Sequence, residues 1–352
     1  MKFQSKIRRI LIGAALCIGM TSISPGAFAA DPEITLRLGT IAPEIWSLGA
    51  VIKKVFEPKL EEYAGGRIDL VVHYRGSLCS EAACIEQLGL GQIDIATSSS
   101  SNVGAFGTTF NIIDLPYLFQ GQEEANKIIN SWLAAELSRR VEREMGMHLI
   151  ALVPVGGFRN VVNSKREVRV PSDLKGLKIR VTKSPTEFNL IRSWGAIPVP
   201  YAWASLYEGL QSGVVQGMYV QDIITSAFKF FEVVSNITEV NSAYVAHPVL
   251  MSKKRYDSLP DWARKAIDRA GQDMQREAFA IDFAWQKLLI NAMKGKIAVY
   301  VPNKTERAEW QQGARDAWVS VKGTYDPKLA RRILEEQGQT ELINELESAG
   351  AL

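Results

Sequence analysis

The sequence predicts an α/β fold with two lobes, and three observations support this prediction. Short apolar or alternating runs, typical of strands, are separated by segments with helical spacing, a pattern that favours largely parallel sheets. A helix that ends in glycine and leads into a short strand occurs twice with the same offsets, at residues 86–93 and 208–215. The chain is also longer than the roughly 250–300 residues at which a single core usually stops growing. Two related halves that face each other across a cleft are therefore expected.

The first part of the chain contains three predicted strands and two predicted helices. Ile34, Leu36 and Leu38 alternate with polar residues, which indicates a strand with one buried face. The other elements expected here are a helix at residues 46–63 stopped by Gly65, a strand at residues 68–72, a helix at residues 81–90 and a strand at residues 93–96. A run of serines at residues 98–101 follows the last of these strands and should form a loop that faces the cleft.

In the middle of the chain, residues 178–181 predict a short strand that carries an arginine. The two apolar residues of this segment alternate with Lys178 and Arg180, so Arg180 points away from the apolar face. Arg159 follows another apolar run, residues 149–155, and has the same local setting. Ligands of open α/β sheets bind in the crevice beyond the strand ends, and a guanidinium there offers a planar fork that suits a carboxylate. Two such arginines predict a small anionic ligand.

The longest predicted helix lies late in the chain. From Asp261 to Met293 there is no proline and a single glycine, Gly271, and the apolar residues recur on one face. At 1.5 Å per residue this helix would be about 50 Å long, more than the diameter of a small domain, so it should lie across both lobes. A strand at residues 297–301 and amphipathic helices at residues 307–319 and 329–346 close the chain.

Residues 1–29 have the pattern of a secretory signal peptide. Lysines and arginines precede an apolar run at residues 10–20, and small residues lead to a cleavage site after Ala29. The apolar run is shorter than the roughly 20 residues of a membrane-spanning helix. Leu16 stands before Cys17 where a lipoprotein signal requires a small residue. The mature protein is therefore expected in the periplasm.

Two cysteines remain after signal cleavage, Cys79 and Cys84. In an oxidising compartment an even pair at this short spacing predicts a disulfide rather than two free thiols. Because the closed loop is small, the disulfide should contribute about 2 kcal/mol to stability.

Charge and motifs argue against several classes of function. The chain has 41 basic and 38 acidic residues, and the basic excess lies in the signal segment, so no basic block remains to bind nucleic acid. His73, His148 and His247 are scattered without zinc spacing, so neither a metal site nor a cofactor is expected. The sequence lacks the nucleophile elbow, the Walker phosphate loop, the zinc-protease motif and the dinucleotide fingerprint. We therefore expect that the protein is not an enzyme.

Several spaced motifs, in order, resemble the extracytoplasmic solute receptors of tripartite ATP-independent periplasmic (TRAP) transporters, the DctP-type family. The motifs are Gly-Phe-Arg at residues 157–159 and the segments 171–181, 195–200 and 206–217, with a further signature at residues 114–119. The resemblance covers nearly the whole chain after residue 30. It implies a periplasmic-binding-protein-like (type II) fold with a long helix spanning both lobes. It also implies a monomeric receptor that binds a small organic carboxylate in an interlobe cleft and delivers it to the membrane subunits of the transporter.

The resemblance implies which side chains contact the ligand. Arg180 matches the arginine that clamps the ligand carboxylate, and Arg159 matches a second ligand-facing arginine. From the sequence alone, Arg180 could instead be a surface residue or pair with Asp222. Trp203 stands where the family has an aromatic wall, with a core tryptophan as the alternative. The other candidates are Lys183, where some acid-sugar binders have an asparagine, Tyr219 and Gln221 as substitutes for polar contacts of relatives, and Trp46, Ser98 and Asn102 in loops of the first lobe.

The expected organisation is a signal peptide at residues 1–29, lobe I at residues 30–155 and 245–284, lobe II at residues 156–244 and 285–328, and a C-terminal helix at residues 329–352. Two alternative functions remain open from the sequence. One is an ABC-type periplasmic binding protein of the same architecture. The other is a secreted hydrolase that uses the cleft, which would turn its ligand over, whereas a receptor would return it unchanged.

Overall fold

The computed structural model describes residues 32–352, so the predicted signal peptide lies outside the described residues. A ten-stranded sheet runs through the molecule in the order β2-β1-β3-β9-β4-β7-β5-β6, with β8 beside β4 and β10 beside β8. The strands are β1 (Ile34–Gly39), β2 (Ile68–His73), β3 (Ile95–Thr97), β4 (Met147–Asn163), β5 (Lys178–Val181), β6 (Ile197–Pro200), β7 (Gly217–Gln221), β8 (Asn236–Thr238), β9 (Tyr244–Ser252) and β10 (Ala298–Tyr300).

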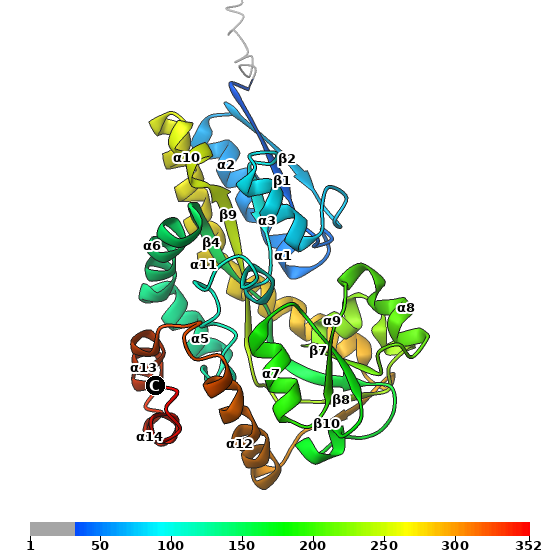
Figure 1. Cartoon of the computed structure of the whole chain (residues 1–352). Coiled ribbons are helices and arrows are strands. Elements are labelled where there is room, and N and C mark those ends of the chain that lie inside the picture. The colour runs from blue at the N-terminus through cyan, green and yellow to red at the C-terminus, as the bar shows by residue number, and fades with distance from the viewer. Residues whose placement is uncertain (1–31) are drawn as a thin grey trace, which may run out of the picture.

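Two lobes share the long strands β4 and β9, which run through the centre of the molecule (Figure 1). In the first lobe, β1 to β3 adjoin β9, and β9 pairs with β4. In the second lobe, the end of β4 pairs with β7 and β8, and β5, β6 and β10 complete the sheet. The outer pairs are parallel as predicted, whereas β4 is antiparallel to β7, β8 and β9. The sheet is therefore mixed, because the shared strands carry the chain back and forth between the lobes.

The connection between the lobes contains two glycines in the middle of β4. The register between β4 and β9 shifts between Pro154 and Phe158, and Gly156 and Gly157 have φ values of 72° and 75°. A Cβ added to Gly156 would lie 2.7 Å from the side chain of Ile223. Only glycine adopts such a backbone readily and leaves room for the close neighbour. This point of β4 is therefore a candidate hinge.

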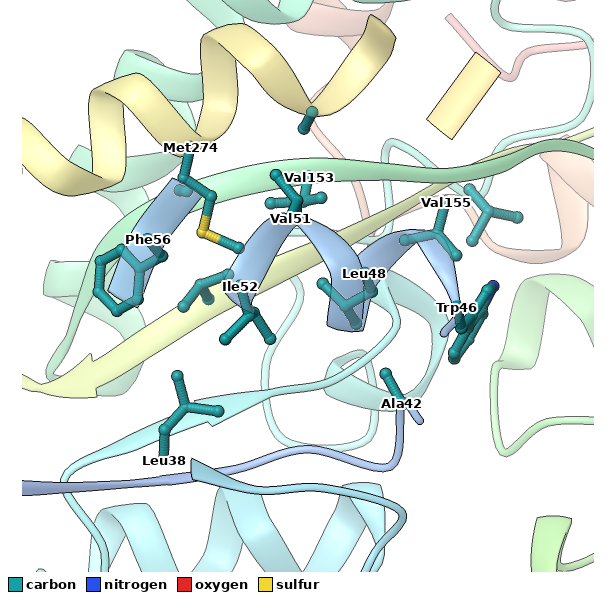
Figure 2. Packing of buried hydrophobic residues seen from close by; sticks show 14 of the residues in the cluster. Leu38, Ala42, Trp46, Leu48, Val51, Ile52, Phe56, Val153, Val155 and Met274 are labelled. Carbon is teal, nitrogen blue, oxygen red and sulfur yellow. The ribbon is translucent and has the colours of Figure 1, made fainter. Parts of the chain in front are cut away.

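Helices of the first lobe cover both faces of its sheet. They are α1 (Ser47–Val51), the π-helical turn η1 (Ile52–Phe56), α2 (Glu57–Ala64), α3 (Glu81–Gly89), α4 (Ser100–Val103), α5 (Gln122–Ile128), η2 (Ile129–Leu133), α6 (Ala134–Met145) and α10 (Lys253–Ser258). The predicted helix 46–63 is confirmed as the continuous run α1–η1–α2, which ends where Gly65 turns left-handed. Figure 2 shows how its apolar side chains, such as Leu48 and Phe56, pack between Leu38 of β1 and Met274.

The second lobe has its own smaller core. Its helical elements are η3 (Pro171–Leu174), α7 (Pro185–Ser193), η4 (Trp203–Ser205), α8 (Leu206–Gln211), α9 (Asp222–Ala227), η5 (Phe230–Glu232) and α12 (Lys304–Ser320). Trp194, directly after α7, and Trp310 of α12 meet edge to face with centroids 4.8 Å apart, and both are fully buried. Ile179 and Val181 of β5 lie in the same core, so the alternation predicted for this strand is confirmed.

The predicted long helix is confirmed as α11 (Asp261–Met293). It packs against α1 and α2 of the first lobe, along β4, and against α9 of the second lobe. Gly271 permits a close approach, because a Cβ there would lie 2.4 Å from the carbonyl oxygen of Ile150. Near the candidate hinge, the backbone N–H of Gly156 donates a bifurcated hydrogen bond to the two carboxylate oxygens of the buried Asp282, at 2.8 and 2.9 Å. The helix therefore connects both lobes to the strand that joins them.

The C-terminal segment differs from the prediction of one helix at residues 329–346. It forms two helices, α13 (Pro327–Glu336) and α14 (Thr340–Ser348), because Gly338 adopts a left-handed φ of 66° between them. Apolar residues of both helices join the core formed by α5 and α6, two helices that were not among the predicted elements. No helix within residues 32–352 is long and apolar enough to cross a membrane.

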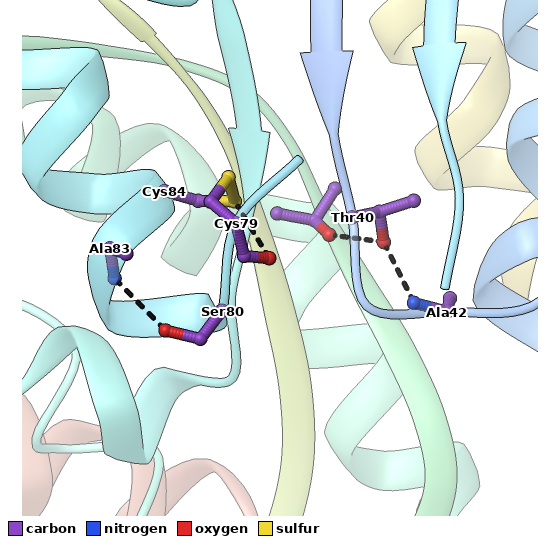
Figure 3. Close-up of a disulfide and its surroundings, with 7 residues drawn as sticks. Thr40, Ala42, Cys79, Ser80, Ala83 and Cys84 are labelled. Atoms are coloured by element: carbon purple, nitrogen blue, oxygen red, sulfur yellow. Dashed lines mark hydrogen bonds between the residues drawn. A yellow bond between two sulfur atoms is a disulfide. The ribbon is translucent and has the colours of Figure 1, made fainter. Parts of the chain in front are cut away.

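The predicted disulfide between Cys79 and Cys84 is present, with the Cα atoms 5.2 Å apart (Figure 3). It packs on Gly39 at the end of β1, where an added Cβ would lie 3.0 Å from one sulfur and 3.1 Å from the other. Ser80, inside the loop, caps α3 by accepting a hydrogen bond from the backbone nitrogen of Ala83 (Figure 3). The disulfide therefore fixes where α3 begins.

Candidate ligand-binding site

Two adjoining cavities lie where the ends of β1, β5 and β7 meet between the lobes. The inner chamber has a volume of about 40 Å³, and the outer cavity has a volume of about 540 Å³. Both are lined by Ile41 after β1, Thr182 after β5, Glu81, Asn102, Arg180 and Trp203. This is the crevice beyond the strand ends in which α/β sheets bind ligands.

Arg180 is buried at the boundary of the two cavities, with 4% of its surface exposed. Because β5 alternates, its neighbours Ile179 and Val181 enter the core while Arg180 faces the cleft. Its Nε donates a hydrogen bond to the carbonyl oxygen of Tyr201 at 3.1 Å. No carboxylate in the described part of the chain pairs with it within 4.0 Å. Burial lowers the pKa of Arg180 to about 10, and Glu187 opposes this shift, so the guanidinium remains charged at neutral pH.

The structure also shows whether Asp222 is the partner of Arg180. Asp222 accepts a hydrogen bond from Asn160 at 2.8 Å and does not pair with the arginine. The guanidinium carbon of Arg180 lies 5.7 Å from the ring centroid of Trp203 instead.

Arg159 lines the inner chamber, but its charge is already balanced within the protein. Its Nη2 lies 3.0 Å from Oε1 of Glu187 and donates a hydrogen bond to the hydroxyl of Ser101 at 2.9 Å. Its Nη1 donates to the carbonyl oxygen of Tyr219 at 3.2 Å. Glu187 in turn accepts a hydrogen bond from the backbone nitrogen of Thr182 at 2.8 Å. Since Ser101 belongs to the first lobe, Arg159 is also a contact between the lobes.

Asn102 and Glu81 form a polar pair on the first-lobe side of both cavities. Glu81 accepts hydrogen bonds from the backbone nitrogen of Ser99 and from Nδ2 of Asn102, each at 2.6 Å. Burial raises the pKa of Glu81 above its ordinary value, although these hydrogen bonds and Arg180 oppose the shift. Glu81 was not among the predicted site residues. Its position inside the loop closed by Cys79 and Cys84, in the first turn of α3, is the sequence signal that could have pointed to it.

Trp46 and His247 bring two unpaired polar atoms to the inner chamber. Each residue is 3% exposed, and their rings meet edge to face at 5.9 Å. Neither Nε1 of Trp46 nor Nδ1 of His247 has a hydrogen-bond partner in the described residues. Burial, with a smaller contribution from Arg159, lowers the pKa of His247 to about 3, so its ring is neutral near pH 7. No sequence pattern pointed to His247, because a single histidine within an apolar strand carries no motif.

Aromatic rings form the wall of the outer cavity. Trp203 meets Phe228 edge to face with centroids 4.9 Å apart, and Phe228 meets Trp46 in the same way at 5.8 Å. Trp203 is half-buried and lines both cavities, so it is a wall residue that also packs on the core.

The remaining predicted site residues divide into two groups. Gln221 lines the inner chamber and donates a hydrogen bond to the carbonyl oxygen of Val155 at 2.9 Å, and Lys183 lines the outer cavity with an exposed side chain. Tyr219 and Ser98 line neither cavity. Tyr219 lies on the same face of β7 as Gln221 but two residues further from the strand end, in the core of the second lobe, where its hydroxyl forms a hydrogen bond with that of Ser242 at 2.6 Å. Ser98 is fully buried at the end of β3.

Elsewhere in residues 32–352, two further cavities contain none of the predicted site residues. They lie between α6 and the start of α13, and between α12 and α14, with volumes of about 360 and 600 Å³. The same described residues contain no group of three histidine, cysteine or carboxylate side chains that could hold a metal ion.

Residues 38–323 match the model of the bacterial extracellular solute-binding protein family 7, DctP. The chain is 29% identical to the 2,3-diketo-L-gulonate-binding periplasmic protein YiaO of Escherichia coli over 80% of this chain and 84% of the relative. It is 26% identical to the C4-dicarboxylate-binding periplasmic protein DctP of Rhodobacter capsulatus over 93% and 96% of the two chains.

Solved structures share the fold. The sugar acid binding protein DctPAm from Advenella mimigardefordensis, in complex with galactonate, superimposes with a TM-score of 0.81 at 22% identity, over 87% of this chain and 97% of that chain. A TRAP periplasmic solute binding protein from Sulfurospirillum deleyianum with bound succinate gives 0.77 at 21% identity, over 86% and 98%.

Proposed function

The chain belongs to the bacterial extracellular solute-binding protein family 7, and we propose that it is the periplasmic receptor of a TRAP transporter. In this function it binds a small organic carboxylate between its lobes and delivers it to the membrane subunits. The relatives named above bind a sugar acid or a C4-dicarboxylate by their printed names, and a carboxylate is the feature that these ligands share.

Arg180 is the observation that carries this proposal. A buried guanidinium with a single backbone acceptor retains unused donors, and leaving a buried charge without a counterion costs free energy. A ligand carboxylate at the boundary of the two cavities would accept two parallel hydrogen bonds from the guanidinium and neutralise its charge. Trp46, whose indole N–H has no acceptor within residues 32–352, would supply a further donor in the inner chamber.

Closure of the lobes is the second part of the proposal. The cavities receive side chains from both lobes, and contacts such as that between Arg159 and Ser101 already cross the cleft. A ligand that touches both lobes binds the closed form better than the open form, and this difference in affinity drives closure. We propose that Gly156 and Gly157 of β4 form the hinge, and that the two lobes have the boundaries predicted from the sequence. We also propose that the receptor acts as a monomer.

We propose no catalytic role, so the ligand should leave the protein unchanged. Mass spectrometry of ligand released from freshly purified protein tests the function. An organic acid recovered in near-stoichiometric amount supports it. Retention of a neutral or cationic compound alone would contradict it.

A further inference from the structure

The outer cavity has a wall that suits a ring better than a polyol. Its volume of about 540 Å³ lies within the range of small-molecule sites. The segment from Pro200 to Ala204 lines one side with Tyr201 and Trp203, and Phe228, Ile41 and Pro43 complete the apolar surface. Aromatic side chains in edge-to-face contact, as Trp203 and Phe228 are, present ring faces and edges that pack well against another ring.

Inside this cavity, few donors or acceptors of the lining side chains are free to bond a ligand. Glu81 accepts a hydrogen bond from Nδ2 of Asn102, and the hydroxyl of Thr182 accepts one from the backbone nitrogen of Ser184 at 3.1 Å, which, among the described residues, leaves Oδ1 of Asn102 and the Thr182 proton open to a ligand. Besides Arg180, the other polar groups of this lining are the phenol hydroxyl of Tyr201 on the aromatic wall and the exposed side chains of Arg75, Ser80 and Lys183. A sugar acid would therefore bury several hydroxyls against apolar side chains, and each unpaired hydroxyl carries a desolvation cost.

The charges at the inner chamber allow one ligand carboxylate. Arg159 is paired with Glu187, which leaves Arg180 as the buried cation open to a ligand in the described residues. A second carboxylate would meet Glu81, the apolar wall or the exposed cations at the mouth, and exposed pairs contribute little. The inner chamber, at about 40 Å³, is far smaller than the outer cavity, at about 540 Å³, so the smaller carboxylate group fits it better than a ring does.

From these observations we propose that the ligand is an aromatic monocarboxylate. Its carboxylate lies at Arg180 and the inner chamber, and its ring lies in the outer cavity beside Trp203. The proposal rests on the carboxylate-receptor function and narrows it to a ligand class that differs from the sugar acids and dicarboxylates named for the relatives.

Titration calorimetry on the mature, ligand-free protein tests this proposal directly. Benzoate, phenylacetate and 3-phenylpropanoate place a ring at three distances from the carboxylate, while succinate and galactonate serve as polar acids of similar size. We expect at least one aromatic acid to bind about tenfold or more tightly than both polar acids, a difference of about 1.4 kcal/mol. Tighter binding of succinate or galactonate, or no binding by the aromatic series, would overturn the proposal.

Variants of the aromatic wall give an independent test. Trp203→Ala should lower the affinity for the most tightly bound aromatic acid by about tenfold or more, because the ring of the ligand loses its largest apolar contact. Tyr207→Ala is the matched control, since Tyr207 packs on Phe230 but lines neither cavity. If Trp203→Ala does not fold by circular dichroism, Trp203→Leu keeps much of the apolar volume and removes the aromatic face. Parent-like affinity in the folded Trp203 variant would also overturn the proposal.

The carboxylate-receptor function and the assignment of an aromatic ligand can fail separately. If a polar acid binds and Arg180→Ala abolishes that binding, the carboxylate-receptor function stands and the aromatic assignment falls. If neither the aromatic nor the polar acids bind and the retained compound is no acid, the receptor function itself falls.

Discussion

Nη2 of Arg159 lies 3.0 Å from Oε1 of Glu187, and both side chains are almost fully buried beside the inner chamber. The pair gives the two arginines of the site different roles. Arg159 is neutralised by the protein and holds the second lobe against Ser101 of the first. Arg180 has no such partner within residues 32–352, so on the proposed function it is the position at which a ligand carboxylate would be neutralised.

This pairing predicts a large effect of Glu187→Gln on stability. The variant keeps the shape of the side chain but leaves the buried guanidinium of Arg159 without its counterion, which should cost about 3–5 kcal/mol. Urea denaturation measures the loss. The control is Glu167→Gln, which breaks the exposed pair with Arg169 and should cost less than about 1 kcal/mol. Equal, small losses in both variants would contradict the assigned role of Glu187.

Arg180→Ala should abolish tight binding while the protein remains folded. Removing the guanidinium from an enclosed carboxylate should cost about 2–5 kcal/mol, more than about a hundred-fold in affinity at the middle of this range. Arg180→Lys keeps the charge but loses the two-donor fork, so its loss should be smaller. Titration calorimetry with the recovered ligand gives both values. Arg192→Ala, which removes an exposed arginine bonded to Asn189, should bind like the parent.

The disulfide should protect both cysteines of the mature chain from alkylation. Cys79 and Cys84 are bonded to each other, and Cys17 lies in the predicted signal peptide. Iodoacetamide followed by mass spectrometry should label neither residue before reduction and both after it. Replacing both with serine should lower the free energy of unfolding by about 2 kcal/mol, because the closed loop is short. Labelling of the native, oxidised protein would show that the bond does not form.

The sequence predicted the elements with strong local signals and missed those that depend on tertiary packing. The helix Asp261–Met293 was predicted with its observed bounds, because a long proline-free amphipathic segment needs no other information. The break at Gly338 was missed, since a glycine inside a helical pattern is often tolerated. The antiparallel pairing of β4 and β9 was also missed, because an apolar run does not reveal which strand will lie beside it.

The same distinction holds at the site. Alternation placed Arg180 on the polar face of a strand, the loop at residues 182–185 placed it near the strand end, and the family resemblance gave it a role. Tyr219 lies in the core of the second lobe although Gln221, on the same face of β7, lines the inner chamber, because alternation does not show how far from the cleft a strand residue lies. Glu81 and His247 reach the cavity only because the disulfide loop and β9 bring them there.

Asp114 should make stability depend on pH near neutrality. Burial, assisted by Glu187, raises the pKa of this carboxyl from 3.8 to about 7 in the folded protein. The folded state therefore binds more protons than the unfolded state between these values, and the contribution of Asp114 to stability falls as pH rises from about 4 to 7. The free energy of unfolding of Asp114→Asn, relative to that of the parent, should increase as pH rises from 5 to 8. Urea denaturation measures this difference. Asp316→Asn, on the exposed face of α12, should show no such gain.

Ligand binding should bring the lobes together, and the structure indicates which contacts report this motion. The hydroxyl of Ser184 in the second lobe lies 3.4 Å from Oδ2 of Asp114 in the first lobe, beside the contact between Arg159 and Ser101. These contacts cannot all persist if the lobes separate about the glycines of β4.

Small-angle scattering should therefore give a smaller radius of gyration with saturating ligand than without it. Arg180→Ala at the same ligand concentration should keep the larger radius, because the carboxylate contact that favours the closed form is missing. An identical radius for the parent protein with and without ligand would show that the two lobes form a rigid pocket and that the glycines of β4 do not act as a hinge.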